Sequence, residues 1–167
     1  MEVKLDMMKK DLQSSSEIDR SQVGRIMPPF NCIIEKGEIR RFAEAIGDLN
    51  PLYLDETYAH LQGYRSVIAP PTFPVCIRLP DDPPWIVGLD RTRVLAGEQT
   101  FLYSRPIVAG DILSCQLHFV SVEDKHGSLG NMEILTQDLR GVDVQGNIIF
   151  THRRLSIVRE KASTLRT

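Results

Sequence analysis

Two side chains that could take part in acid–base chemistry, Asp48 and Tyr53, lie close together in the sequence, with Asn50 between them as a group that could bind the turn backbone or orient an active site. The carboxylate of Asp48 could hold and activate a water molecule, a task for a general base with a pKa of about 4–7. The phenol of Tyr53 has an ordinary pKa near 10, so it would need a downward shift of about three units, or about 4 kcal/mol, to act as a base. Nothing in the sequence supplies that shift. Asp48 could equally cap the turn that it forms with Asn50 and Pro51, and both interpretations stay open.

Other residue types that support catalysis are scattered along the chain. The histidines share no ligand spacing with a third donor, so we expect no metal site. They are His60, His118, His126 and His152. The sequence contains no Gly-rich phosphate loop and no G-x-S-x-G motif. Its three cysteines are scattered and form no C-x-x-C pair. Such a set is typical of a protein in a reducing compartment, where cysteines serve as small buried apolar side chains. They are Cys32, Cys76 and Cys115.

The composition predicts one globular domain that binds neither nucleic acid nor a membrane. A chain of 167 residues is long enough to bury a core without disulfides or a structural metal. Its 20 basic and 22 acidic residues nearly cancel, and no basic stripe that would contact nucleic acid is present. No apolar run approaches the roughly 18 residues of a membrane span. The first residues also lack the apolar core of a signal peptide, so we expect a cytoplasmic protein.

The spacing of apolar residues indicates helices in the first half of the chain and strands in the second. Apolar residues recur every three or four positions within 38–47, which predicts a helix that Gly47 ends. A shorter helix is predicted over 55–62. From Val94 onward, alternating polarity and intervening turns predict strands. These strands cover 95–103, 112–122, 132–139 and 147–158. Their short connections make neighbouring strands antiparallel, so we expect an α+β domain whose sheet packs on one central helix.

Polar segments limit this domain at both ends. Residues 1–20 carry charges around a run of serines and are expected to form a flexible lead-in. Residues 21–160 form the predicted domain, and residues 161–167 form a C-terminal tail.

Two blocks of the sequence resemble the MaoC-type dehydratases and R-specific enoyl-thioester hydratases. The first block runs from Ala45 to Phe73 and contains A-I-G-D-L-N-P, then G-Y and A-P-P-T-F. The second runs from Leu95 to Asp111 and contains L-A-G-E-Q, R-P and A-G-D. Both blocks occur in the family's order, and the resemblance extends over about residues 20–158. The chain is most similar to the N-terminal, or accessory, type of hydratase half.

This resemblance implies the hot-dog fold, in which an antiparallel sheet wraps around a central helix and two such units pair into a double hot-dog. Catalytic members carry D-x-N-P-x-H, whose aspartate and histidine activate one water for addition to a trans-2-enoyl thioester. Here Asp48, Asn50 and Pro51 match the motif, whereas Tyr53 stands at the position of the histidine. The resemblance therefore implies Asp48 and Tyr53 as the candidate catalytic residues.

The A-P-P-T-F segment would mark the start of the central helix, where the family uses backbone N–H groups to polarise the thioester carbonyl. Pro70 and Pro71 have no N–H group, so Thr72 and Phe73 would have to supply the donors. Together with Asn50, these four residues are the substrate-binding residues that the resemblance implies. A proline-rich helix start with a packing role alone is the alternative.

The missing histidine favours a supporting role. In relatives of this kind, one half keeps the aspartate–histidine pair and the other half lines the tunnel for the acyl chain. We therefore expect the substrate-lining half of a (3R)-hydroxyacyl-thioester dehydratase, which acts on an acyl-CoA or acyl-ACP thioester without a cofactor. Its partner would be a catalytic hot-dog subunit or a second copy of this chain. Two alternatives stay open: a self-sufficient homodimeric enoyl-CoA hydratase that uses Asp48, and a non-catalytic module that binds acyl thioesters.

Overall fold

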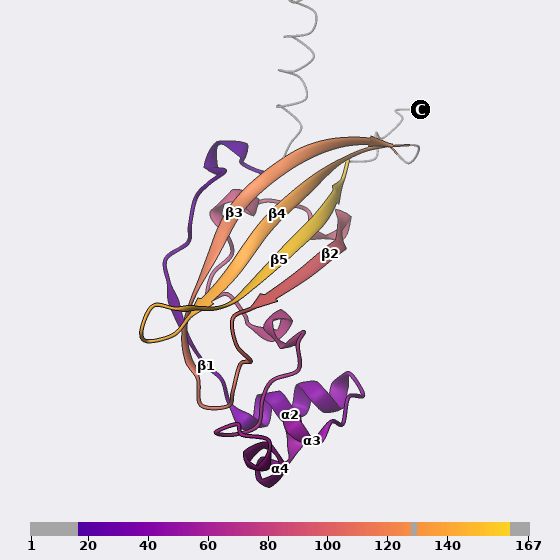
Figure 1. Ribbon diagram of the computed structural model, residues 1–167. Coiled ribbons are helices and arrows are strands. Elements are labelled where there is room, and N and C mark those ends of the chain that lie inside the picture. Colours follow the sequence, from indigo (N-terminus) through magenta and orange to yellow (C-terminus); the bar gives the residue numbers. More distant parts are fainter. Residues whose placement is uncertain (1–16, 128–129, 161–167) are drawn as a thin grey trace, which may run out of the picture.

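A five-stranded antiparallel sheet forms one layer of the protein, and the helices α2 to α4 lie together at one end of it (Figure 1). The computed structural model describes residues 17–127 and 130–160. The strands are β1 (Phe30–Ile33), β2 (Val94–Tyr103), β3 (Ile112–Gly127), β4 (Gly130–Val142) and β5 (Ile148–Arg159). They follow the order β1-β3-β4-β5-β2, which leaves β1 and β2 at the two edges. This arrangement confirms the predicted α+β class and the antiparallel sheet.

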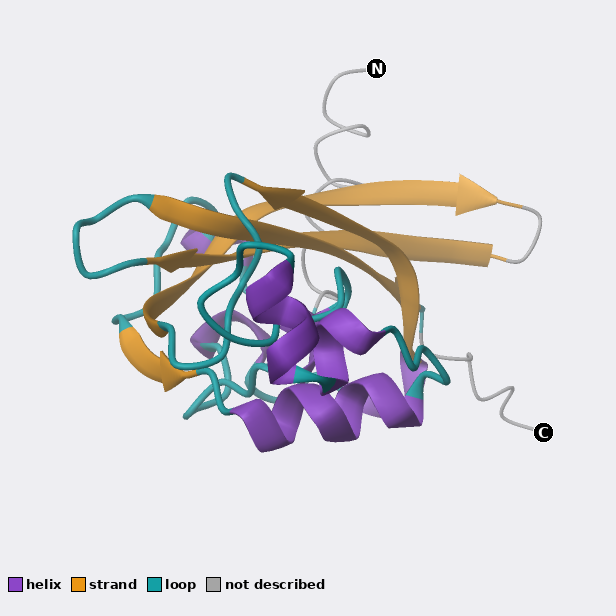
Figure 2. Ribbon diagram, turned by 60° about the horizontal axis from the view of Figure 1, so that its bottom comes forward, coloured by secondary structure: helices purple, strands orange, loops and turns teal. Residues whose placement is uncertain are grey.

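The helices are short apart from α2. They are α2 (Lys36–Ala45), α3 (Pro51–Leu54) and α4 (Glu56–Leu61), with the 3-10 turns η1 (Arg20–Gln22), η2 (Phe73–Cys76), η3 (Pro84–Ile86) and η4 (Arg91–Arg93). Figure 2 shows α2 to α4 on the same side of the sheet. The predicted apolar face of α2 is confirmed, because Ile39 and Ala43 are fully buried. Gly47 follows this helix with a φ of +73°, a left-handed conformation that glycine adopts without strain.

The structure corrects the expectation that Ala69–Phe73 begins a central α-helix. This segment leads into η2, a single 3-10 turn over Phe73–Cys76, after which Ile77 is extended. The cause lies in the prolines on either side. Only five residues separate Pro74 from Pro80, and the residue before a proline avoids helical geometry. A segment that short and rich in β-branched residues does not sustain an α-helix, so α2 is the longest helix of the described chain.

The four predicted strands are confirmed as β2 to β5, and the sequence missed β1. The observed β3 continues five residues past the predicted end at Val122. In this part of the strand polar residues replace the alternating pattern, and pairing with β4 holds the backbone in place. Strand β1 has only four residues, and it pairs with β3 from Phe30 to Ile33. Such a short strand carries too few residues for a periodic signal.

Chain segments before the predicted domain start also contact the core. Ile18 is 2% exposed, and the backbone N–H of Asp19 donates a hydrogen bond to the Trp85 carbonyl at 2.9 Å. Residues 17–20 therefore pack on the domain, while most of the predicted lead-in and the predicted tail lie outside the described residues. Among the described residues, no helix is long and apolar enough to cross a membrane.

Close packing in the sheet makes Gly141 sensitive to substitution. A Cβ atom at this position would lie 2.2 Å from Cε1 of Phe150, a ring that is 1% exposed. We expect Gly141→Ala to lower the free energy of unfolding by about 2 kcal/mol, because the buried ring has to move. Gly37→Ala is the matched control. Its Cβ would meet only the flexible Arg41 side chain at 3.5 Å, so this helix position should gain about 0.5 kcal/mol. Urea unfolding measures both, and equal effects would contradict the packing argument.

Candidate functional site

Asp48 and Asn50 both bind the backbone of the turn that follows α2. The N–H group of Asp48 donates to the Ala43 carbonyl at 3.0 Å, which closes the end of the helix. Its carboxylate accepts a hydrogen bond from the Asn50 N–H at 3.3 Å. The Asn50 side chain in turn accepts from the Leu52 N–H at 3.0 Å and caps α3. This geometry supports the turn-capping interpretation of Asp48, although its exposed carboxylate can still bind water.

Tyr53 lies inside the domain rather than in an open cleft. It is 8% exposed and belongs to the main hydrophobic cluster. Burial and the nearby negative charge of Asp48 raise the pKa of this phenol above its ordinary value. A base at neutral pH would need the opposite shift. Tyr53 therefore stays protonated at neutral pH, so its hydroxyl group can form hydrogen bonds but cannot act as a base.

The proline-rich segment presents one of its two predicted N–H donors. The Phe73 N–H donates to the Pro70 carbonyl at 2.9 Å, so it is already used within the turn. Within the described part of the chain, no backbone carbonyl accepts from the Thr72 N–H. The Tyr103 hydroxyl donates to the Pro71 carbonyl at 2.6 Å and ties this segment to the end of β2. Pro71 and Thr72 are exposed, whereas Pro70 and Phe73 are buried.

A pocket of about 720 Å³ lies between β1, α2 and the segment of η2. Its lining mixes apolar and aromatic side chains with the charged side chains of Glu38, Arg41 and Arg78. It consists of Phe30, Asn31, Cys32, Ile33, Glu38, Arg41, Phe42, Ala45, Phe73, Val75, Cys76, Ile77 and Arg78. The rings of Phe42 and Phe73 meet edge to face, with their centroids 5.7 Å apart. This volume falls in the range of small-molecule sites, so the pocket can hold a group of substrate size.

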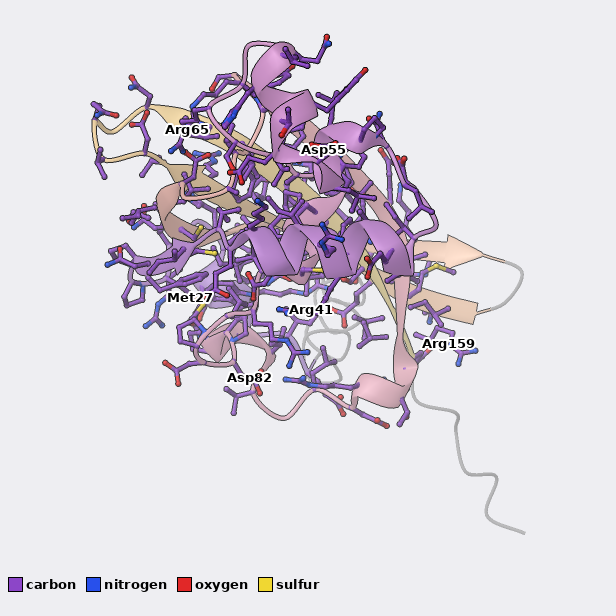
Figure 3. All side chains as sticks on the ribbon, turned by 90° about the horizontal axis from the view of Figure 1, so that it is seen from below. Met27, Arg41, Asp55, Arg65, Asp82 and Arg159 are labelled. Atoms are coloured by element: carbon purple, nitrogen blue, oxygen red, sulfur yellow. The ribbon has the colours of Figure 1, made fainter. Side chains whose placement is uncertain are left out.

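Of the predicted site residues, only Phe73 lines this pocket. The pocket lining does not include Asp48, Asn50 and Tyr53, which follow the end of α2. It also does not include Pro70, Pro71 and Thr72. Sequence reasoning missed Arg41 and Arg78, which add positive charge to the lining. Figure 3 shows Arg41 on α2. A signal for Arg41 was present, because Glu38, Arg41 and Ala45 share one face of the predicted helix at three- and four-residue spacing.

An ion-pair cluster around the buried carboxylate of Asp111 fixes the loops that carry Arg65 and Arg105. Asp111 is 5% exposed and accepts hydrogen bonds from Arg105 at 2.8 Å, from Arg65 at 2.5 Å and from the Val108 N–H at 2.8 Å. Burial alone would raise the pKa of Asp111. The hydrogen bonds and the two guanidinium charges outweigh burial, and the pKa lies below its ordinary value. In Figure 3, Arg65 of this cluster and Asp82 lie on opposite sides of α2.

None of the histidines supplies the missing imidazole beside Asp48 in the contacts of the described residues. His60 is exposed, and its ring contacts the Arg65 carbonyl at 3.0 Å. His152 is 1% exposed and stacks on Phe101, with ring centroids 4.5 Å apart. The described residues contain no group of three or more side chains that could hold a metal ion.

Comparisons with known proteins agree with this architecture. A model of the "FAS1-like, dehydratase domain region" matches residues 21–152. A UPF0336 protein of Thermobifida fusca (strain YX) is 36% identical over 154 residues, which cover 87% of this chain and 96% of that protein. A solved structure called MaoC-like dehydratase is 23% identical with a TM-score of 0.70, over 85% of this chain and 43% of that longer one.

A second solved structure is a complex of two different subunits. It is the C-terminally truncated HadBC complex, a (3R)-hydroxyacyl-ACP dehydratase of Mycobacterium tuberculosis. The similarity has a TM-score of 0.68 at 23% identity and covers 85% of this chain and 99% of that one. Similarity at this level concerns the fold, and it confirms the predicted hot-dog architecture.

Proposed function

Because this chain belongs to the FAS1-like dehydratase domain family, we propose that it is the substrate-lining half of a two-subunit (3R)-hydroxyacyl-thioester dehydratase. The same enzyme would catalyse the reverse hydration of enoyl thioesters. The proposal is carried by the environment of Tyr53, whose burial and proximity to Asp48 raise its pKa. A phenol in that setting cannot take a proton from water, so the proton transfer needs an imidazole from another subunit.

The sheet offers an edge for this second subunit. Strand β2 is ten residues long and pairs only with β5 among the described strands. It exposes Leu95 and Leu102 at 45% and 63%. A long edge with exposed apolar residues favours pairing with another strand. We therefore place a catalytic hot-dog subunit, which carries the motif histidine, along β2, and the two-subunit HadBC complex provides a precedent for this fold.

The substrate would be an acyl thioester carried by coenzyme A or by acyl carrier protein. Thr72 would offer its free N–H to the thioester carbonyl, next to Pro70 and Pro71, while Asn50 keeps the turn after α2 in shape. Phe73, whose ring lines the pocket between β1 and α2, would contact the thioester end of the substrate. No cofactor takes part in this proposal, and the enzyme would work on fatty-acid-type substrates in the cytoplasm.

Co-expression tests the proposal directly. The chain is purified alone and together with a hot-dog subunit that carries an intact D-x-N-P-x-H motif. Hydration of crotonyl-CoA and of a longer trans-2-enoyl-CoA is then followed. We expect no turnover above background for the chain alone and clear turnover for the pair. Turnover by the chain alone that Asp48→Asn abolishes would instead identify a self-sufficient homodimer. Tight acyl-CoA binding without turnover in either preparation would identify a binding module.

A further inference from the structure

A row of hydrogen-bond donors crosses the core-facing side of the sheet. Gln99 on β2 lies directly opposite Arg154 on β5, and Arg154 lies opposite Gln137 on β4. Directly opposed residues in antiparallel strands share one face, with Cβ atoms about 5 Å apart. The next position is Phe119 on β3, which faces Gln137 and stacks on Trp85 with ring centroids 5.0 Å apart. The row therefore runs from the open β2 edge toward the centre of the domain.

Gln99 at the start of the row is exposed, whereas the donors further along it are shielded and lack acceptors inside the protein. Nε of Arg154, Nε2 of Gln137 and Nε1 of Trp85 are shielded from solvent and have no hydrogen-bond partner among the described residues. Gln137 is 6% exposed and Trp85 is fully buried. The neighbouring Arg153, on the opposite face, pairs with Asp138 at 2.7 Å. No described carboxylate forms an ion pair with Arg154, so this half-buried guanidinium carries its positive charge without a counterion among the described residues.

Neighbouring groups add no negative charge. His152 lies two residues before Arg154 on β5, on the same face of the sheet. Burial together with the charge of Arg154 lowers the pKa of His152 to about 4. Its imidazole is thus neutral at neutral pH, and it contacts the carboxamide oxygen of Gln99 at 2.8 Å. That contact leaves the N–H2 group of Gln99 free to donate. A guanidinium flanked by two carboxamide donors is complementary to a carboxylate, which is planar, anionic and rich in acceptors.

We propose that Gln99, Gln137 and Arg154 bind a carboxylate at the far end of the substrate's acyl chain, so that the preferred substrate is a thioester with a terminal acid group. This inference rests on the proposed function. Gln99 lies four residues from Tyr103 along β2, which is about 13 Å at the rise of a strand. Tyr103 holds the Pro71 carbonyl beside the Thr72 N–H, and half-buried Phe101 lies between the two positions. A medium-length chain spans this distance.

Binding of two thioesters that differ only at the far end tests the proposal. The probes are sebacoyl-CoA, which ends in a carboxylate, and decanoyl-CoA, which ends in a methyl group. Titration calorimetry of the full chain, alone and in the pair, should show at least 10-fold tighter binding of sebacoyl-CoA. Trp85 is the single tryptophan, so its fluorescence should change with sebacoyl-CoA. Arg154→Met should remove the difference between the probes, whereas Arg140→Met, on the opposite face of the sheet, should preserve it.

The outcomes separate this inference from the proposed function. If neither probe binds, both the carboxylate site and the proposed function are overturned. Equal affinities in the unmodified chain overturn the carboxylate site alone. A preference seen in the chain but lost in the pair would identify a carboxylate of the partner as the occupant, which also overturns it.

Thermal unfolding of the ligand-free protein gives an independent measurement. An arginine kept without a counterion for binding weakens the free fold, so Arg154→Met should raise the Tm by about 2–4 °C. A fall in Tm would show that the fold itself needs Arg154, and that result would overturn the proposal.

Discussion

Tyr53→Phe should change kcat of the reconstituted pair by less than about twofold, whereas replacing the motif histidine of the catalytic partner should lower kcat about 10²–10⁴-fold. The difference follows from the pKa of an imidazole and the pKa of the Tyr53 phenol. An imidazole exchanges protons near neutral pH. The phenol of Tyr53 is 8% exposed, and burial and Asp48 move its pKa away from neutrality. Removing its hydroxyl group therefore removes no proton transfer.

Steady-state hydration of a trans-2-enoyl-CoA by the purified pair measures these effects. Tyr58→Phe serves as the matched control, because Tyr58 is 38% exposed on the neighbouring helix α4. A large loss of kcat for Tyr53→Phe at unchanged KM, with Tyr58→Phe unaffected, would assign the chemistry to Tyr53. It would also support the self-sufficient homodimer with Asp48 as its second catalytic group.

Local signals in the sequence were sufficient for the elements and their class. The spacing of Ile39 and Ala43 predicts α2 because a single apolar stripe has one place to be buried. Alternation along 112–122 predicts β3 for the same reason. The failure at Ala69–Phe73 is instructive, since the resemblance implied a helix and the prolines at 74 and 80 left only one 3-10 turn. That departure in local geometry also changes which N–H groups remain free.

The chemistry of the interior depends on pairings that local signals do not contain. Gln99, Gln137 and Arg154 are far apart in the sequence, and only the register of three strands places them side by side. Arg154 follows Arg153 directly, yet one side chain pairs with Asp138 and the other faces the core. Alternation along β5 decides this difference, and it could have been predicted only once the strand was assigned to a sheet with one buried face.

Asp111→Ala should cause the largest loss of stability, about 3 kcal/mol in the free energy of unfolding. The substitution leaves the buried Val108 N–H without its acceptor and removes the hydrogen bonds from Arg105 and Arg65. The two arginine side chains are 38% and 57% exposed, so their return to water offsets part of the cost. The matched control is Asp82→Ala, which breaks an ion pair whose partners are both about two-thirds exposed and should cost less than about 0.5 kcal/mol.

The same carboxylate predicts how stability depends on pH. Its folded-state pKa lies below the value of about 3.9 expected in the unfolded chain, because hydrogen bonds and guanidinium charges outweigh the effect of burial. The stabilisation is therefore complete above that pH and is lost as the pH falls through the folded-state pKa. The stability difference between the unmodified protein and Asp111→Asn should stay constant from pH 7 to about 5 and shrink below about 4. Urea unfolding at each pH measures it, and a difference that grows toward acid would mean that burial, rather than Arg105 and Arg65, controls this group.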